Sequence, residues 1–193
     1  MRANNLFARA ITAPSRLFVA VMILLAGLAA AKATFTQVSI KARATAPSSG
    51  GELRCLGGTA TGAWPPCTPG SKSQLRGVVT TFRQVSSDPL HTGTRTLVTN
   101  ASLDESGRGH IWGTWVVTLD DGRGQWEGIF TGSTFGWFGA AGGEVVGHGC
   151  EGEVDGMQLK LFFSYENFPI DPATGQPGIE TDTGYRLDPR GAR

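Results

Sequence analysis

Residues 109–132 constrain the fold more than any other part of the chain, because they have the pattern of a β-hairpin. Side chains on a strand alternate between its two faces, and one face of the first arm holds Ile111, Gly113, Trp115, Val117 and Leu119. The matching face of the second arm holds Trp126, Gly128, Phe130 and Gly132. Residues 120–123 reverse the chain, and Gly122 can take the positive φ that a short hairpin loop requires. The pattern predicts a twisted antiparallel sheet.

Similar strand patterns recur along the chain at the spacing of an all-β domain, and no long helical period follows residue 33. The predicted strands cover residues 34–44, 75–85, 93–103, 110–119, 124–131, 144–151 and 157–165, with 183–187 as a short closing strand. Glycines inside these strands, such as Gly113, Gly128 and Gly147, weaken a flat strand but suit a sharply bent sheet. We therefore predict an all-β fold, a single antiparallel β-barrel of about eight strands. A β-sandwich is the alternative.

Residues 1–33 have the pattern of a secretory signal peptide. A head with three arginines and no acidic residue precedes an apolar run over residues 17–31, and small residues surround Lys32. The apolar run is shorter than the roughly 20 residues that a membrane span needs. We expect cleavage after Ala33, a secreted or periplasmic protein, and no transmembrane span afterwards. The alternative is an uncleaved signal anchor that tethers the protein to a membrane.

The remaining 160 residues predict one domain, 34–193, with a loop-rich excursion at 52–70 and a turn-rich C-terminal tail from 168. Residues 1–33 hold four of the 17 basic residues and none of the 16 acidic ones, so the remainder carries a net charge of −3. A basic stripe that would attract a phosphate backbone is absent from this remainder. We therefore expect no nucleic-acid partner.

Three cysteines follow the predicted signal peptide. Cys55 and Cys67 flank a glycine- and proline-rich segment, and outside the cytosol a disulfide between them would clamp it. The alternative pairs Cys150 with either of them and leaves another thiol free. A C-x-x-C motif is absent, so we expect such a disulfide to be structural rather than catalytic.

The hairpin at 109–132, followed by the glycine-rich residues 147–152 and an apolar strand, resembles small secreted bacterial β-barrel proteins of unassigned activity. The same stretch, about residues 75–165, is distantly similar to the allene oxide cyclase and dirigent barrels, in which a G-x-G-x-[FY]-x-G segment follows two long strands. Cys150 stands near the aromatic position of that segment. The resemblance implies barrel geometry. It transfers no catalytic residue onto a matching position of this chain.

The most polar segment, residues 144–155, holds the main candidates for catalysis. In an extended conformation Glu144 and His148 share a face, and inside a barrel they would form an acid–base pair or two metal ligands. One His and one Glu do not make a metal-site signature, so we predict no metal and no cofactor. The alternative is a surface strand. Glu127, Glu144 and His148 are the residues on which any enzyme hypothesis depends, while His91 and His110 are expected to be exposed.

The aromatic residues between 112 and 138 offer a second type of site. Trp112 lies on the face of its strand opposite Trp115, and Trp137 and Phe138 are flanked by glycines at the tip of a loop. An indole at the mouth of a barrel makes a platform for an apolar ligand. Trp112, Trp137 and Phe138 are therefore the predicted ligand-binding residues.

Three functions remain open from the sequence. The first is a secreted, non-enzymatic β-barrel that binds a small apolar ligand or a cell-envelope component. The second is an isomerase or cyclase of the allene oxide cyclase kind, which moulds an apolar substrate in an open interior. The third is a purely structural surface protein. A nucleophile-elbow G-x-S-x-G, a P-loop and a dinucleotide fingerprint are all absent. The sequence does not give the oligomeric state.

Overall fold

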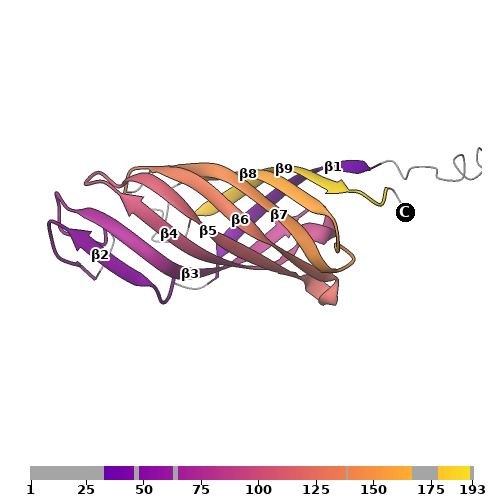
Figure 1. The fold of residues 1–193 in the computed structure, drawn as a ribbon, viewed down its shortest axis with the longest axis horizontal. Coiled ribbons are helices and arrows are strands. Elements are labelled where there is room, and N and C mark those ends of the chain that lie inside the picture. Colours follow the sequence, from indigo (N-terminus) through magenta and orange to yellow (C-terminus); the bar gives the residue numbers. More distant parts are fainter. Residues whose placement is uncertain (1–32, 46–47, 63–64, 138, 167–177, 192–193) are drawn as a thin grey trace, which may run out of the picture.

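A computed structural model describes residues 33–45, 48–62, 65–137, 139–166 and 178–191 (Figure 1). Nine strands lie in these ranges: β1 (Thr34–Ala44), β2 (Glu52–Leu56), β3 (Lys72–Ser86), β4 (Gly93–Leu103), β5 (Arg108–Leu119), β6 (Gly124–Phe135), β7 (Ala141–Gly152), β8 (Gln158–Tyr165) and β9 (Ile179–Asp188). Two short 3₁₀ turns, η1 (Pro89–His91) and η2 (Asp120–Gly122), join consecutive strands. Within these ranges no helix has the length and apolar character needed to cross a bilayer.

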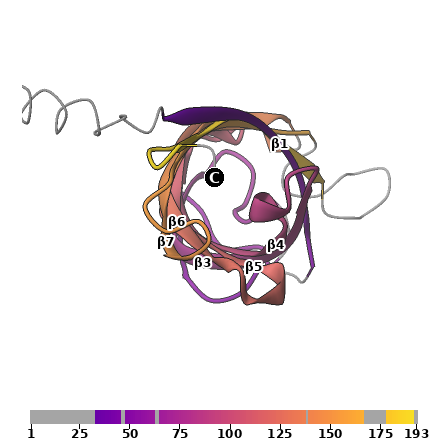
Figure 2. The ribbon, with the colours of Figure 1, turned by 90° about the vertical axis from the view of Figure 1, so that its right-hand side faces the viewer.

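The strands form one antiparallel sheet that closes on itself. From β3 to β9 each strand pairs with the next one in sequence, and β1 pairs with both β9 and β3. Eight strands thus complete a ring, which Figure 2 shows end-on, and β2 adds a ninth strand beside residues 72–76 of β3. The prediction of an antiparallel barrel of about eight strands is confirmed.

The structure adds detail to two predicted segments. The loop-rich segment 52–70 begins with a short strand, β2, which pairs with β3 beyond the part of β3 that β1 occupies. The closing strand is twice as long as expected, because β9 begins at Ile179 rather than at residue 183. The predicted tail from 168 therefore contains a full barrel strand, although its first ten residues lie outside the described ranges.

The predicted hairpin is built from β5 and β6. Asp121 and Gly122 both take positive φ in the loop, 59° and 67°, as tight hairpins with right-handed twist require. The expected inward faces are confirmed: Trp115 and Trp126 are buried, and both indoles lie in the barrel interior. The β8 side chains Leu159, Leu161, Phe163 and Tyr165 belong to the same core.

Glycine in β6 and β7 is required because the Trp115 indole lies across the backbone there. A Cβ added at Gly147 would be 2.4 Å from Cζ2 of Trp115, and one at Gly128 would be 2.9 Å from its Nε1. The indole nitrogen donates to the carbonyl oxygen of Ile129 at 3.2 Å. The glycines therefore allow the sheet to bend closely around a large side chain.

Cys55 and Cys67 form a disulfide, which confirms the predicted pairing, and Cys150 is a free thiol. The bond closes a loop whose ends are 12 residues apart and ties β2 to the segment before β3. We expect Cys55→Ser to lower the free energy of unfolding by about 2–3 kcal/mol, because the unfolded chain regains loop entropy. Denaturant unfolding measures this change. Cys150→Ser is the control, and an equal loss in both variants would contradict the assignment.

Candidate functional site

The barrel interior contains a buried charge cluster, which we call the polar cluster: Arg95 of β4 with Glu180 and Asp182 of β9. The two guanidinium nitrogens of Arg95 lie 2.6 Å from Glu180 Oε1 and 2.7 Å from Asp182 Oδ2. All three side chains are buried. Since β4 and β9 are not neighbours in the ring, the cluster braces the barrel across its interior.

Two carboxyl groups share one cation in the polar cluster, and the pKa of Glu180 is raised as a result of its burial there. Burial raises the pKa of Glu180 from 4.5 to about 8, and the nearby Asp182 adds to this rise while Arg95 opposes it. Burial alone would lower the pKa of Arg95, but the attraction of both carboxylates reverses this and raises it. The raised pKa favours the neutral, protonated form of Glu180 at neutral pH, and its oxygen still accepts from Arg95.

His91 closes the interior next to the polar cluster. It lies in η1, is fully buried, and stacks on the Trp126 ring with centroids 5.1 Å apart. The Gln84 side chain donates to the His91 carbonyl oxygen at 2.7 Å, and the Trp126 indole donates to that of Leu90 at 2.8 Å. The expectation that His91 is exposed is therefore wrong, because η1 folds into the end of the barrel (Figure 2).

The imidazole of His91 is neutral in this environment. Burial lowers its pKa from 6.5 to about 4, although Asp88 raises it in part and Arg186 lowers it further. Asp88 itself forms an ion pair with Arg186 of β9 at 2.5 Å. A neutral ring suits the stacking contact with Trp126 and costs less to bury than a charged one.

The space left between these side chains is small. His91, Arg95, Asp182 and Trp126 line an interior cavity of about 10 Å³. This is near the minimum that admits one water molecule, and apolar ligands occupy pockets of hundreds of Å³. Among the described residues, Asp182 Oδ1, Arg95 Nε and both ring nitrogens of His91 form no hydrogen bond to protein, and a water in this cavity would be within their reach. The cavity does not accommodate an apolar ligand or substrate.

Opposite pKa shifts at Glu180 and His91 predict how stability depends on pH. Between pH 4.5 and 8 the folded state holds a proton on Glu180 that the unfolded state releases, so rising pH destabilises the fold. Between pH 4 and 6.5 the unfolded state protonates His91 and the folded state does not, so rising pH stabilises it. The two effects offset each other below pH 6.5.

We therefore expect the free energy of unfolding to fall from pH 6.5 to 8, at up to about 1.4 kcal/mol per pH unit. Urea unfolding at several pH values measures this slope. Glu180→Gln keeps an acceptor for Arg95 and removes the titrating group, so its slope above pH 6.5 should be much flatter. A slope that is equally steep in the variant would contradict the assignment of the proton to Glu180.

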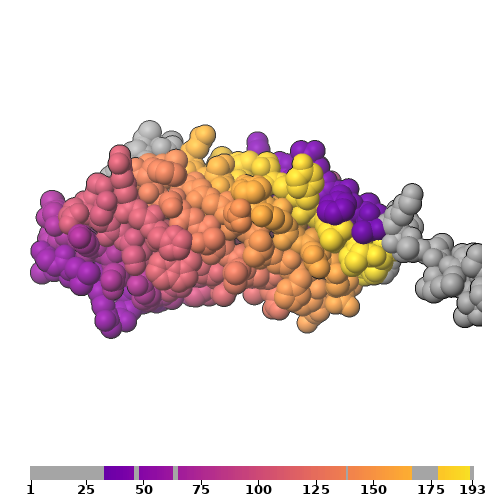
Figure 3. Space-filling view, turned by 45° about the horizontal axis from the view of Figure 1, so that its top comes forward, coloured from indigo at the N-terminus to yellow at the C-terminus, as the bar shows by residue number. Residues whose placement is uncertain are grey.

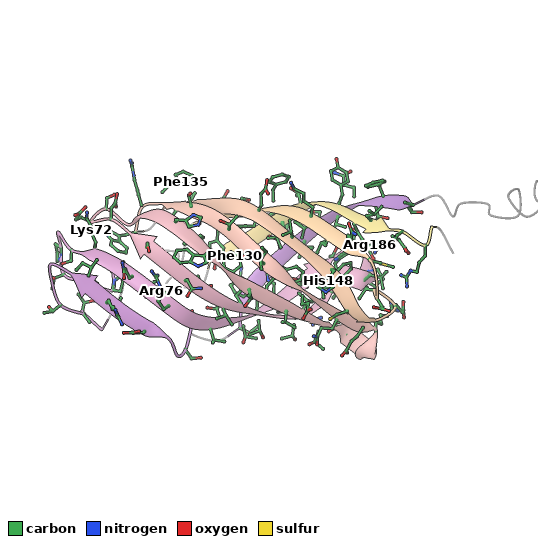
Figure 4. The ribbon with its side chains drawn as sticks, viewed as in Figure 1. Lys72, Arg76, Phe130, Phe135, His148 and Arg186 are labelled. Carbon is green, nitrogen blue, oxygen red and sulfur yellow. A yellow bond between two sulfur atoms is a disulfide. The ribbon has the colours of Figure 1, made fainter. Side chains whose placement is uncertain are left out.

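The three residues named for catalysis lie on the outer face of the barrel. Glu127 Oε1 and His148 Nε2 lie 3.3 Å apart on β6 and β7, and Glu144 faces Lys160 of β8 at 3.6 Å. All of these side chains are about half exposed, and Figure 4 shows where His148 lies on β7. The structure brings Glu127 and His148 together, but it places neither of them, nor Glu144, inside the barrel. Their pairs are surface ion pairs, which contribute little stability.

The predicted ligand-binding aromatics do not converge on one site. Trp112 lies on the outer face, with the His110 ring stacked at 5.2 Å and the Arg76 guanidinium 4.9 Å from its ring centroid. Arg76, labelled in Figure 4, also donates to the carbonyl oxygen of Ala101 at 2.7 Å, so its contact with Trp112 is held against the sheet. Trp137 packs against the core and donates to the Glu105 carbonyl oxygen at 3.0 Å. Phe138 lies outside the described residues.

A group of exposed apolar side chains lies at nearby positions on the outside of β6–β9, around Lys160. We call Ile129, Val146, Phe162 and Tyr185 the outer apolar patch; they are 38% to 58% exposed. Ile129 pairs with Val146, Val146 pairs with Lys160, and Lys160 pairs with Tyr185 across the strands. The Lys160 ammonium lies 5.6 Å from the Phe162 ring centroid. Figure 3 shows the outer surface over these later strands, coloured from orange to yellow.

The outer apolar patch was not identified from the sequence, because one exposed apolar residue per strand is ordinary and gives no pattern along the chain. The patch exists because the register aligns these residues across neighbouring strands. Within the described ranges, no group of three or more His, Cys, Asp or Glu side chains is arranged to hold a metal ion. Comparisons with family models, curated proteins and solved structures return no match to this chain.

Proposed function

We propose that this protein is a secreted, non-enzymatic β-barrel that binds a component of the cell envelope through its outer apolar patch. The observation that carries the proposal is the contrast between the two faces of the β6–β9 sheet. The inner face packs against aromatic residues and the polar cluster, with a cavity of only about 10 Å³ between them. The outer face exposes the four apolar side chains of the outer apolar patch to solvent.

The exposed surface supports binding in two ways. Contiguous apolar area on a soluble surface is costly to leave in water, and such patches mark interaction sites more often than isolated apolar residues do. Phe162 and Tyr185 are also the aromatic type that dominates the energy of interfaces. The neighbouring pair of Lys160 and Glu144 adds polar groups at the edge of the patch, as interfaces commonly have.

Secretion remains part of the proposal. The residues 1–33 have the pattern of a signal peptide, and the Cys55–Cys67 disulfide agrees with an oxidising compartment. We do not extend the cyclase hypothesis, because Glu127, Glu144 and His148 face outward and the cavity beside His91 and Asp182 is too small for a substrate. A purely structural role is the second candidate, since tight packing around this cavity agrees with it equally.

Site-specific photo-crosslinking in cells that export the protein tests the proposal. Phe162 is replaced by a benzophenone-bearing amino acid, and Gln158, exposed on the same face of β8 but outside the patch, is the matched control. We expect an adduct with an envelope component from position 162 and none from position 158. Equal adducts at both positions, or an adduct with a second copy of the chain alone, would contradict the proposal. No adduct at all would favour the structural role.

A further inference from the structure

One edge of the barrel sheet is open along β1. Residues 40–44 of β1 pair with residues 82–86 of β3, whereas residues 34–39 pair with β9 alone among the described residues. This half of β1 extends past the end of β3, at the end of the barrel where the described chain ends (Figure 1). An unpaired strand edge is a template for another strand.

The backbone groups on this open edge belong to Phe35 and Gln37. The Thr45 N–H donates to the Thr81 carbonyl oxygen at 2.9 Å, so odd-numbered residues of β1 direct their backbone groups toward β3. Ser39 follows the same alternation, since its carbonyl oxygen points toward β3 and accepts from the Ser86 hydroxyl at 2.9 Å. Because this alternation continues along β1, the N–H and C=O groups of Phe35 and Gln37 point away from β9, on the side where β3 has ended.

This edge also lacks the features that normally keep an exposed strand edge from pairing with another chain. Residues 34–39, TFTQVS, contain no charge, no proline and no glycine, and the Phe35 side chain is 70% exposed. The charged residues Lys41 and Arg43 occur only where β1 is paired on both sides. The other edge strand, β2, differs: it is five residues long, carries Glu52 and Arg54, and is tied by the disulfide. Proteins commonly protect exposed edges by such charges and short lengths.

We propose that two copies of this chain pair through β1, edge to edge and antiparallel, around a two-fold axis at Thr36. Phe35 of one copy then faces Gln37 of the other, and the two pairs exchange about four backbone hydrogen bonds. On the outer face, the Phe35 side chain covers Gln37 of the second copy and approaches its Tyr185, which is the registered neighbour of Gln37. A two-fold arrangement makes one segment complementary to itself.

Charge is compatible with a second copy at this seam. Two charged side chains near residues 34–39 are paired within each copy: Arg186 with Asp88, and Arg190 with Asp188. These two pairs therefore bring no uncompensated charge to the seam. The contact area is small and the pairing is concentration-dependent. The seam borders the outer apolar patch at Tyr185, but the backbone pairing between Phe35 and Gln37 does not depend on the patch.

Cysteine crosslinking and solution mass test the pairing. In a Cys150→Ser background, Thr36→Cys places two thiols at a non-hydrogen-bonded pair, where Cα atoms are about 4.5 Å apart and a disulfide can form. We expect a disulfide-linked dimer after mild oxidation. Thr183→Cys, on the outer face of β9, is the control and should stay monomeric. Crosslinking that is equal at both positions would overturn the proposal.

Gln37→Pro gives the second readout in the protein without added cysteines. It removes an outward N–H that β9 does not use, so an open edge tolerates it. Sedimentation should show a dimer for the native chain at high concentration and a monomer for the variant, with Gln37→Lys as a second blocking substitution. A native chain that stays monomeric at its highest soluble concentration overturns the proposal. Position 162 should give the same photo-adduct in Gln37→Pro, which separates this test from that of the patch.

Discussion

Arg95→Ala should destabilise the protein more than any other single substitution at a charged residue, by about 3–5 kcal/mol. The change leaves Glu180 and Asp182 buried without their cation, and burial of an uncompensated charge is the costly outcome. Two-state domains have total stabilities of about 5–15 kcal/mol, so a large fraction of the fold's stability depends on this side chain. Denaturant unfolding measures the loss.

Arg83→Ala is the matched control for Arg95. Its guanidinium also binds a carboxylate with two nitrogens, Asp120 at 2.6 and 2.7 Å, but this pair lies exposed on the surface. Its loss should cost less than about 1 kcal/mol. If Arg95→Ala fails to fold, the triple variant Arg95→Met, Glu180→Gln, Asp182→Asn removes all three ionisable groups and should restore the fold. Equal losses from Arg95→Ala and Arg83→Ala would contradict the role of the polar cluster as an interior brace.

Gly128→Val should cost more than about 3 kcal/mol, because the first added carbon already has no room. A Cβ at this position would be 2.1 Å from the Val146 carbonyl oxygen and 2.9 Å from the Trp115 indole nitrogen. The backbone of β7 and a buried indole would both have to move. Thermal unfolding measures the loss, and near-ultraviolet circular dichroism reports the displacement of Trp115.

Gly142→Ala is the control for this substitution. Gly142 lies on β7 in the same sheet, but a Cβ there would meet only the Phe163 carbonyl oxygen, at 3.3 Å. We expect a change within about 1 kcal/mol for Gly142→Ala. Unchanged stability in Gly128→Val would show that the sheet does not bend around Trp115 and would contradict the packing of the barrel core.

The fold was largely predictable from the sequence because its strongest signals are local. The period-two pattern of Ile111, Trp115 and Val117 identifies an inward strand face without knowledge of any partner strand. The bounds of β1 and β4 agree with the prediction for the same reason. The disulfide was predictable from a glycine- and proline-rich segment between two cysteines. Closure of the ring depends on long-range pairing between β1 and β3. The sequence predicted closure only indirectly, through the glycines within the strands.

The polar cluster was not predictable, because it reverses the usual pattern. In β9 the apolar and β-branched residues, such as Ile179 and Tyr185, face outward, while Glu180 and Asp182 face the interior. A period-two reading assigns the charged face to solvent, since Asp, Glu and Arg are rarely buried. Their burial depends on Arg95, which is 85 residues away in sequence from Glu180. Only the closed barrel brings the three together.

The outer apolar patch was missed, and the catalytic candidates were placed wrongly, for a different physical reason. Glu144 and His148 were correctly expected to share a face, but which face of β7 points inward depends on its register with β6 and β8. Val145, between them in sequence, is the residue that packs inside. The same register aligns Ile129, Val146 and Tyr185 on the outside, so the patch and the failed catalytic candidates have a common origin.

The most direct test of binding at the outer apolar patch is to find where an apolar probe binds. Titration of the ¹⁵N-labelled protein with 1-anilinonaphthalene-8-sulfonate, followed by nuclear magnetic resonance, locates the dye on either face of the sheet. We predict shifts in the amide signals around Val146, Phe162 and Tyr185, and a loss of these shifts in Phe162→Ser. The indole N–H of Trp126, buried beside His91, should not move. A shift of the Trp126 indole signal without change at the patch would place the ligand inside the barrel and contradict the account.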